Sequence, residues 1–248
     1  QAEHGTWTSP INALVELYLY LKPTKQVMSD PDILKENTTL SITCSASSCR
    51  PAANITWSGD GIPFTAITED KTTETFNVTS VYKKTVTRQD NGAKIQCTIT
   101  HPALNSSLVT SRNITVWFPP TSVMITNNRE VTAGDKLSLM CTTETSNPIA
   151  IINWMNSTIV PTGDLSATLE LSGQYGGKIS YQYLTITSTR YMDGNIITCS
   201  AENPQTYVTR VHHSVVLSVT YNPLAVISNG SELHVKEGDT SLTLMCVS

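Results

Sequence analysis

The sequence predicts an all-β protein made of tandem β-sandwich domains. Three observations support this prediction. Short segments in which apolar and polar residues alternate recur along the 248 residues, and each ends in a cysteine. A tryptophan follows two of these cysteines at one fixed distance, and a second cysteine follows each tryptophan. Period-two strands with cysteines spaced this way are typical of two facing sheets that each bury one side.

The repeated strand occupies residues 40–44 (LSITC), 137–141 (LSLMC) and 242–246 (LTLMC). Trp57 and Trp154 lie 13 residues after the cysteines of the first two repeats. Residues 87–97 and 189–199 then align without a gap, and each ends in the second cysteine of its unit. The chain therefore contains at least two copies of one domain.

A Cys, Trp, Cys order within about 100 residues of short strands is the signature of an immunoglobulin-like sandwich. Of the possible pairings, the repeat favours the disulfides Cys44–Cys97 and Cys141–Cys199. Their spacings of 53 and 58 residues leave little room for two extra strands, so we predict constant-like domains of the C2 or I type.

Two details refine this prediction. Trp57 and Trp154 are expected to be the core tryptophans that pack on the two bridges. Ile95 and Ile197 occupy the positions where a tyrosine corner would place Tyr, so the corner between the fifth and sixth strands must be held in another way.

Prolines mark the domain junctions, at Lys22-Pro23, Phe118-Pro119-Pro120 and Tyr221-Asn222-Pro223. Proline cannot continue a sheet ladder and stiffens a short linker. We expect residues 1–22 to be the last strand of a truncated upstream domain, 23–119 and 120–220 to be complete domains, and 221–248 to begin another. Trp117 is predicted to pack at a junction, and residues 173–177 (GQYGG) to form a hairpin loop.

Two cysteines remain. Cys49 is expected in the loop before the first tryptophan strand, either free or paired with a cysteine in the missing upstream part, with an intermolecular bridge as an alternative. Cys246 would pair with a cysteine beyond the sequence.

Seven Asn-x-Ser/Thr sequons, together with paired core cysteines, indicate passage through the secretory pathway. The N-glycosylation candidates are Asn37, Asn54, Asn77, Asn105, Asn113, Asn156 and Asn229.

Composition and motifs argue against several classes of function. A formal net charge of −4 without basic clusters disfavours a nucleic-acid partner. No His-Glu zinc motif, Gly-x-Ser-x-Gly elbow or Cys-x-x-Cys pair occurs, so we expect no enzyme activity, no cofactor, no metal site and no small-molecule substrate. No apolar run reaches 18 residues, so any membrane anchor is expected outside this span.

Two motifs carry a family resemblance. Residues 50–57 (RPAANITW) and 90–101 (DNGAKIQCTITH) resemble the second immunoglobulin domain of nectins, nectin-like (SynCAM) molecules and the nephrin group. The resemblance implies that residues 1–22 end a membrane-distal variable domain that performs most of the recognition between cells. No contact residue can be carried over, because that domain is nearly absent here.

The resulting hypothesis is an extracellular segment of an adhesion receptor on the cell surface. It would bind a protein partner on an opposing or the same cell, and this partner would be a second copy or a related immunoglobulin protein. A secreted immune-recognition or matrix protein and the ectodomain of a signalling receptor remain alternatives, because all three use the same modules.

Overall fold

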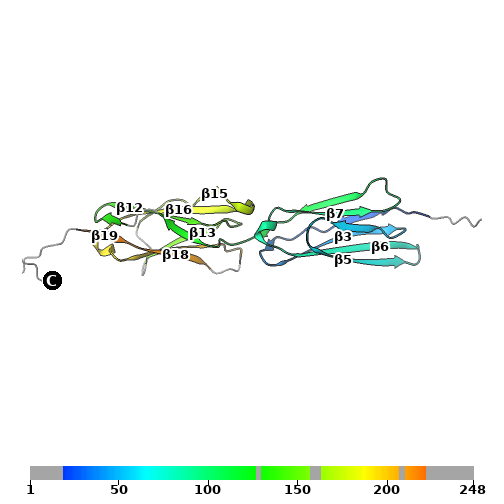
Figure 1. Cartoon of the computed structure of the whole chain (residues 1–248), viewed down its shortest axis with the longest axis horizontal. Coiled ribbons are helices and arrows are strands. Elements are labelled where there is room, and N and C mark those ends of the chain that lie inside the picture. The colour runs from blue at the N-terminus through cyan, green and yellow to red at the C-terminus, as the bar shows by residue number, and fades with distance from the viewer. Residues whose placement is uncertain (1–18, 127–129, 157–162, 207–209, 222–248) are drawn as a thin grey trace, which may run out of the picture.

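The computed structural model describes residues 19–126, 130–156, 163–206 and 210–221. In this part of the chain two β-sandwiches lie end to end and form a rod (Figure 1). The expected all-β fold of tandem immunoglobulin-like sandwiches is confirmed. The outer parts of the expected flanking segments 1–22 and 221–248, with Cys246 and Asn229, lie outside the described residues.

The first sandwich packs a four-stranded sheet, in the order β1-β3-β6-β5, against a three-stranded sheet, β4-β7-β8, and both are antiparallel. A short parallel pair, β2 with β9, closes the end next to the second sandwich. Its elements are β1 (Lys25–Met28), β2 (Leu34–Lys35), β3 (Thr39–Cys49), β4 (Asn54–Trp57), β5 (Ile62–Asp70), β6 (Thr75–Thr85), the 3₁₀ turn η1 (Arg88–Asp90), β7 (Lys94–Thr100), β8 (Leu108–Asn113) and β9 (Val116–Trp117).

The second sandwich repeats this topology, with one sheet in the order β10-β12-β16-β14, to which β15 adds beside β16, and the other in the order β13-β17-β18. A parallel pair, β11 with β19, again closes one end. Its elements are β10 (Val123–Thr126), β11 (Glu130–Thr132), β12 (Lys136–Thr143), β13 (Ile151–Asn156), β14 (Asp164–Leu165), β15 (Leu169–Ser172), η2 (Gln174–Gly176), β16 (Lys178–Thr187), η3 (Arg190–Met192), β17 (Ile196–Glu202), β18 (Val211–Val216) and β19 (Ser218–Thr220).

The alternation seen in the sequence places one side of each strand in the core. On β3, Leu40, Ile42 and Cys44 are buried, whereas Ser41 between them is exposed. Removing apolar surface from water in this way contributes roughly 25 cal/mol per Å². The period of two therefore fixes the register, because a one-residue slip would expose the whole buried set.

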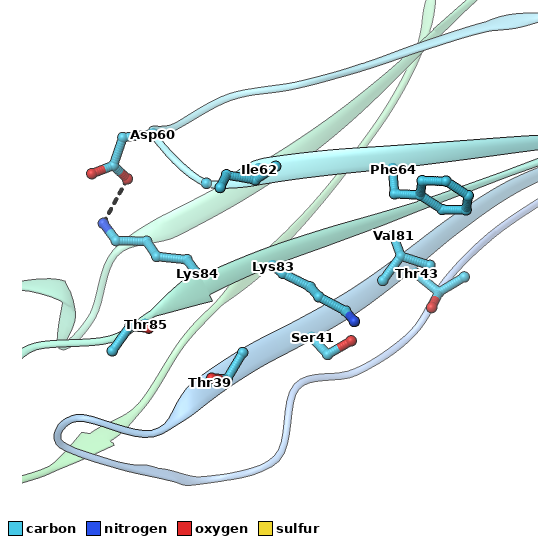
Figure 2. Close-up of a pocket in the computed structure, with 11 residues that line it drawn as sticks. Thr39, Ser41, Thr43, Asp60, Ile62, Phe64, Val81, Lys83, Lys84 and Thr85 are labelled. Atoms are coloured by element: carbon cyan, nitrogen blue, oxygen red, sulfur yellow. Dashed lines mark ion pairs between the residues drawn. The ribbon is translucent and has the colours of Figure 1, made fainter.

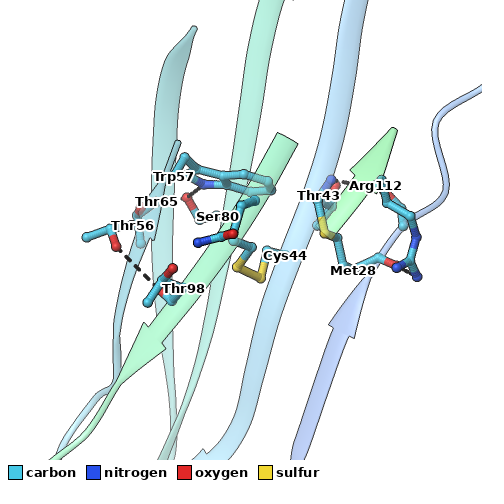
Figure 3. The surroundings of a disulfide bond; sticks show 12 residues. Met28, Thr43, Cys44, Thr56, Trp57, Thr65, Ser80, Thr98 and Arg112 are labelled. Atoms are coloured by element: carbon cyan, nitrogen blue, oxygen red, sulfur yellow. Dashed lines mark hydrogen bonds between the residues drawn. A yellow bond between two sulfur atoms is a disulfide. The ribbon is translucent and has the colours of Figure 1, made fainter. Parts of the chain in front are cut away.

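One disulfide joins the two sheets in each sandwich, Cys44 to Cys97 and Cys141 to Cys199. Figure 3 shows the indole of Trp57 above the first bridge, where its Nε1 donates a hydrogen bond to Ser80 Oγ at 2.9 Å. The two expected core tryptophans differ in burial. Trp154 is buried, whereas Trp57 is only partly buried and packs on the edge of the core.

A carboxylate holds the corner that lacks a tyrosine. Asp90 Oδ2 accepts a hydrogen bond from the backbone N–H of Thr87 at 2.9 Å, and its Oδ1 accepts one from Lys84 Nζ at 2.6 Å. These bonds tie the end of β6 to η1 and so help to fix the corner before β7 without a phenol.

The prediction that Cys49 lies in a loop is wrong. Strand β3 continues through a bulge between Ala46 and Cys49, and the bulge turns Cys49 inward opposite Phe76. The thiol is free and fully buried, and its Sγ donates to the Phe76 carbonyl oxygen at 3.3 Å. A buried thiol cannot reach a second molecule, which argues against the intermolecular bridge.

Replacing Cys44 and Cys97 together by Ala should lower the free energy of unfolding by about 2–5 kcal/mol, because the bridge closes a loop of 53 residues. Urea unfolding followed by tryptophan fluorescence measures this change. Replacing the free Cys49 by Ala is the control for lost side-chain packing alone. An equal effect of the two changes would contradict a stabilising role for the bridge.

Candidate binding surfaces

The described residues offer several surfaces on which binding can be considered. No group of three or more His, Cys, Asp or Glu side chains among them is placed to hold a metal ion. No helix in this part of the chain is long and apolar enough to cross a membrane. The outer sheet faces and the sequons are open to other molecules, and the joint between the sandwiches sets how these surfaces are held relative to each other.

Phe118 is the centre of the joint. Its backbone N–H donates to Asn147 O at 2.8 Å, and the Asn147 N–H donates back to Phe118 O at 2.9 Å. Its side chain is fully buried between the two sandwiches, with the ring edge-on to Tyr175 at 6.5 Å and the Arg88 guanidinium 5.2 Å from its centroid. The linker is thus part of both domains.

Asn91 is the second element of the joint. Its Oδ1 accepts hydrogen bonds from the Val116 N–H at 3.0 Å and from Asn147 Nδ2 at 3.3 Å. Its Nδ2 donates to the Tyr175 carbonyl oxygen at 2.8 Å. A single side-chain amide therefore connects the first sandwich to two segments of the second.

Residues 173–177 are more than the hairpin loop that the sequence predicts. Their turn contains η2 and brings Tyr175 against Phe118 and Asn91. A Cβ on Gly177 would lie 2.7 Å from Ser146 O and 2.9 Å from Phe118 Cζ, so the close approach of the sandwiches requires glycine there. Trp117 lies beside the junction, where it lines a hollow of about 200 Å³ with Pro119 and Thr206.

An ion pair supports the joint from the first sandwich. Arg88 Nε and Nη2 donate to the two carboxylate oxygens of Glu36 at 2.8 and 2.7 Å, and the Arg88 backbone N–H donates to Oε1 at 3.2 Å. The bond from Arg88 holds the pKa of Glu36 below its ordinary value of 4.5. This fork also keeps the guanidinium over the Phe118 ring.

A hollow of about 670 Å³ lies on the outer face of the β3-β6-β5 sheet. Figure 2 shows Ile62 and Phe64 on β5 along one side of it and threonines, a serine and lysines along the other. Ile62 and Phe64 are 78% and 70% exposed. Asp60, with Asp90, raises the pKa of Lys84 to about 12, so Lys84 stays protonated and paired with both carboxylates throughout the physiological range. The hollow is an open surface with both apolar and charged groups.

The sequons of the first sandwich lie on both of its sheets. Asn54 on β4 and Asn113 at the end of β8 are exposed at the two ends of the β4-β7-β8 sheet, and Asn77 is exposed on β6. Asn37 and Asn105 are exposed in connecting segments. Asn156 ends β13 of the second sandwich.

Comparison with known proteins agrees with this geometry. Residues 22–107 match the model of the CD80-like C2-set immunoglobulin domain. Human cell adhesion molecule 3 is 34% identical over 143 residues, which are 54% of this chain and 36% of that protein. Human nephrin is 26% identical over 215 residues, 84% of this chain and 17% of nephrin. This chain thus spans about a third of the first relative and about a sixth of the second.

A solved structure shows the same fold. The crystal structure of the full ectodomain (Ig1–Ig3) of mouse nectin-like molecule 4 superposes with a TM-score of 0.54, at 22% identity, over 84% of this chain and 68% of that one. The chain therefore shares the tandem immunoglobulin fold of that ectodomain, and its residues 22–107 match a C2-set immunoglobulin domain. The resemblance to nectin-like molecules and nephrin that residues 50–57 and 90–101 indicate is confirmed.

Replacing Phe118 by Ala should loosen the joint, because a fully buried ring then leaves a cavity between the domains. We expect a broader distribution of interatomic distances in small-angle X-ray scattering and a loss of about 3–5 kcal/mol in the free energy of unfolding. Phe64→Ala, at an exposed ring, is the matched control and should change neither. Unchanged scattering for Phe118→Ala would show that the joint does not depend on this ring.

The Glu36 pair should make stability depend on pH. Because the pKa of Glu36 is lower in the folded chain, the pair stabilises above the ordinary value of 4.5, and this contribution is lost as pH falls through the folded pKa. Glu36→Gln should therefore be less stable than the parent chain near neutral pH, and the difference should shrink as the pH falls from neutral to below the ordinary value of 4.5.

Thermal unfolding scans across that range measure the effect. Glu74→Gln removes the exposed partner of Arg50 and is the control, since exposed pairs contribute little. A difference between the Glu36→Gln and parent chains that stays constant with pH would refute the assignment.

Proposed function

We propose that this chain is an extracellular segment of an adhesion receptor on the cell surface, which binds a protein partner by contact alone. The observation that carries the proposal is the pairing of two disulfide-bonded sandwiches through a buried joint. Sequence relatives whose names designate cell adhesion molecules support it.

The rod would act as a spacer. Strands β3 and β6 have 11 residues each, and a rise of about 3.3 Å per residue makes each sandwich roughly 35–40 Å long. The joint limits bending, so a recognition domain ahead of residue 23 would stand at a set distance from the membrane. Weak contacts between opposing rods then add by multivalency.

The sequons support an extracellular position. The five in the first sandwich are all exposed, as enzymatic glycosylation requires. We propose that the chain is glycosylated at these positions, that a single-pass anchor lies outside this span, and that the partner is a second copy or a related immunoglobulin protein. No cofactor or catalytic step belongs to this mechanism.

Beads coated with the full ectodomain of the source transcript test the function. We expect them to aggregate with one another or with beads that carry a related immunoglobulin ectodomain. Beads coated with residues 19–221 alone are the control and should aggregate far less, because the resemblance assigns most recognition to the domain ahead of residue 23. Full-ectodomain beads that stay dispersed in both pairings would refute adhesion.

Surface labelling of cells that express the same transcript is the second measurement. An adhesion receptor should be labelled on intact cells and retained in the membrane fraction. Recovery of the protein only from the medium would replace the proposal with a secreted recognition protein.

A further inference from the structure

A small hollow lies at the joint, where the turn after β2 meets the linker and the second sandwich. Its volume is about 200 Å³. Residues of both sandwiches line it, among them Asn37 and Thr38 of the turn, Trp117 of β9, Pro119 of the linker and Thr206 of the second sandwich. Asn37 is also the acceptor of the sequon Asn37-Thr38-Thr39. The hollow therefore has a candidate glycosylation site in its own wall.

The backbone of this sequon is held in a tight turn. The Thr38 N–H donates to Lys35 O at 3.1 Å, and the Asn37 N–H donates to Val86 O at 2.8 Å. Asn37 has a φ of 67°, a left-handed conformation that asparagine adopts more readily than most residues. Its side chain is exposed and makes no hydrogen bond with the described residues. The turn thus fixes the point at which a glycan would begin.

Trp117 gives the hollow a wall that suits a sugar. Val116 is fully buried, so Trp117, the next residue on β9, turns away from the core and is only partly buried. A sugar ring has faces of C–H groups, whose weakly positive hydrogens are attracted to the negative face of an indole. Trp117 lies opposite Lys35 in the β2-β9 pair, two residues before Asn37. The first sugar on Asn37 therefore begins within one turn of this wall.

Two hydroxyl groups supply acceptors for a sugar. Thr38 Oγ1 donates to Lys35 O at 2.6 Å. Thr206 Oγ1 donates to Asn203 O at 3.0 Å. Each hydroxyl has thus used its hydrogen, and its oxygen can still accept from a sugar hydroxyl or an acetamido N–H. Asn203 Nδ2 donates to Phe118 O at 3.4 Å, so Thr206 belongs to the part of the second sandwich that forms the joint. A group that contacts Thr38 and Thr206 together would connect the two sandwiches.

We propose that the first N-acetylglucosamine of a glycan on Asn37 packs in this hollow against Trp117 and stabilises the joint. The inference rests on the proposed glycosylation of Asn37 and gives that glycan a structural role. The occupant follows from the place of the sequon, because a covalent tether holds the sugar beside the hollow at an effective concentration of about millimolar. A contact too weak to retain a free sugar is then sufficient.

Size and charge agree with this occupant. The hollow of about 200 Å³ has the volume of roughly seven waters at ~30 Å³ each, which is room for one sugar ring. The core of an N-linked glycan is uncharged, and Glu36 in the wall already pairs with Arg88 at 2.7 Å. The sugar would therefore enter without displacing the ion pair that supports the joint.

Release of the glycan from the native chain tests the proposal. The 248-residue chain is secreted from animal cells and treated with a peptide N-glycosidase, which must reach the first sugar to cut its bond to asparagine. We expect Asn37 to lose its glycan at least about tenfold more slowly than Asn105, a difference of about 1.4 kcal/mol. Asn105 is the internal control, because it is exposed in the connection between β7 and β8, away from the joint (Figure 1). After reduction and unfolding the two sites should react at equal rates.

A double-mutant cycle assigns the contact to Trp117. Thr39→Val removes the sequon and should lower the urea midpoint of unfolding, whereas Thr39→Ser keeps the sequon and should leave the midpoint unchanged. In a Trp117→Ala chain the sugar has lost its wall, so Thr39→Val should lower the midpoint no further, and Asn37 should lose its glycan as fast as Asn105. Circular dichroism checks the folding of each variant. The comparison of the two sites in the parent chain needs no variant and decides the proposal if Trp117→Ala does not fold.

Peptide mass spectrometry separates this inference from the proposed glycosylation. A chain in which Asn37 carries no glycan would refute glycosylation at that position and this inference with it. An occupied Asn37 that loses its glycan as fast as Asn105 would refute the packing alone and leave the glycosylation standing. An equal effect of Thr39→Val in the parent and Trp117→Ala chains would also refute the packing.

Discussion

The burial of Phe118 is the contact on which the arrangement of the two sandwiches depends. A linker in solvent would let each domain turn freely, and the outer faces would have no fixed relation. Here the Phe118 backbone pairs with Asn147 and its ring packs between Arg88 and Tyr175. The joint sets the equivalent sheets of the two sandwiches on opposite sides of the rod, with β5 and β6 along one side and β15 and β16 along the other (Figure 1).

The amide nitrogen of Asn91 explains why the corner before β7 also takes part in the joint between the sandwiches. Asn91 and Asp193 are equivalent in the repeat, and the Oδ1 of each accepts a backbone N–H, from Val116 at 3.0 Å and from Val219 at 2.9 Å. The Asn91 and Asp193 side chains therefore help to fix the corner between the fifth and sixth strands of each sandwich, which a tyrosine fixes in other immunoglobulin domains. An aspartate offers no donor, whereas the asparagine amide has a spare N–H, which bonds to Tyr175 O. The amide extends this connection into the next domain.

The features that the sequence predicted correctly are those with a local period or a repeated spacing. Alternation placed Leu40, Ile42 and Cys44 on one side of β3, and the class of fold follows from the spacing of cysteines and tryptophans. The features it missed depend on contacts between distant segments. The turn at residues 173–177 resembles an ordinary hairpin until Phe118 is placed against it. Cys49 resembles a loop residue because a bulge leaves no mark in the hydrophobic pattern.

The apolar outer side of the β12-β16-β15 sheet was missed for a related reason. A strand that is apolar on both sides is recognisable as a strand, but the sequence does not say which side is covered. On β16 the buried residues Ser180, Leu184 and Ile186 alternate with an outward row that contains Tyr181 and Tyr183. Only the register with β12 and β15 joins this row to Met140 and Leu169. Because the joint fixes the sandwiches, this face points sideways from the rod and is not covered by the neighbouring domain. The first sandwich carries five sequons and a hollow lined by Lys83 and Lys84, whereas the corresponding sheet of the second sandwich carries exposed apolar side chains at Leu169 and Leu171 and no sequon among its described strands. The two domains therefore differ in what they can contact, although their core, topology and corner are the same.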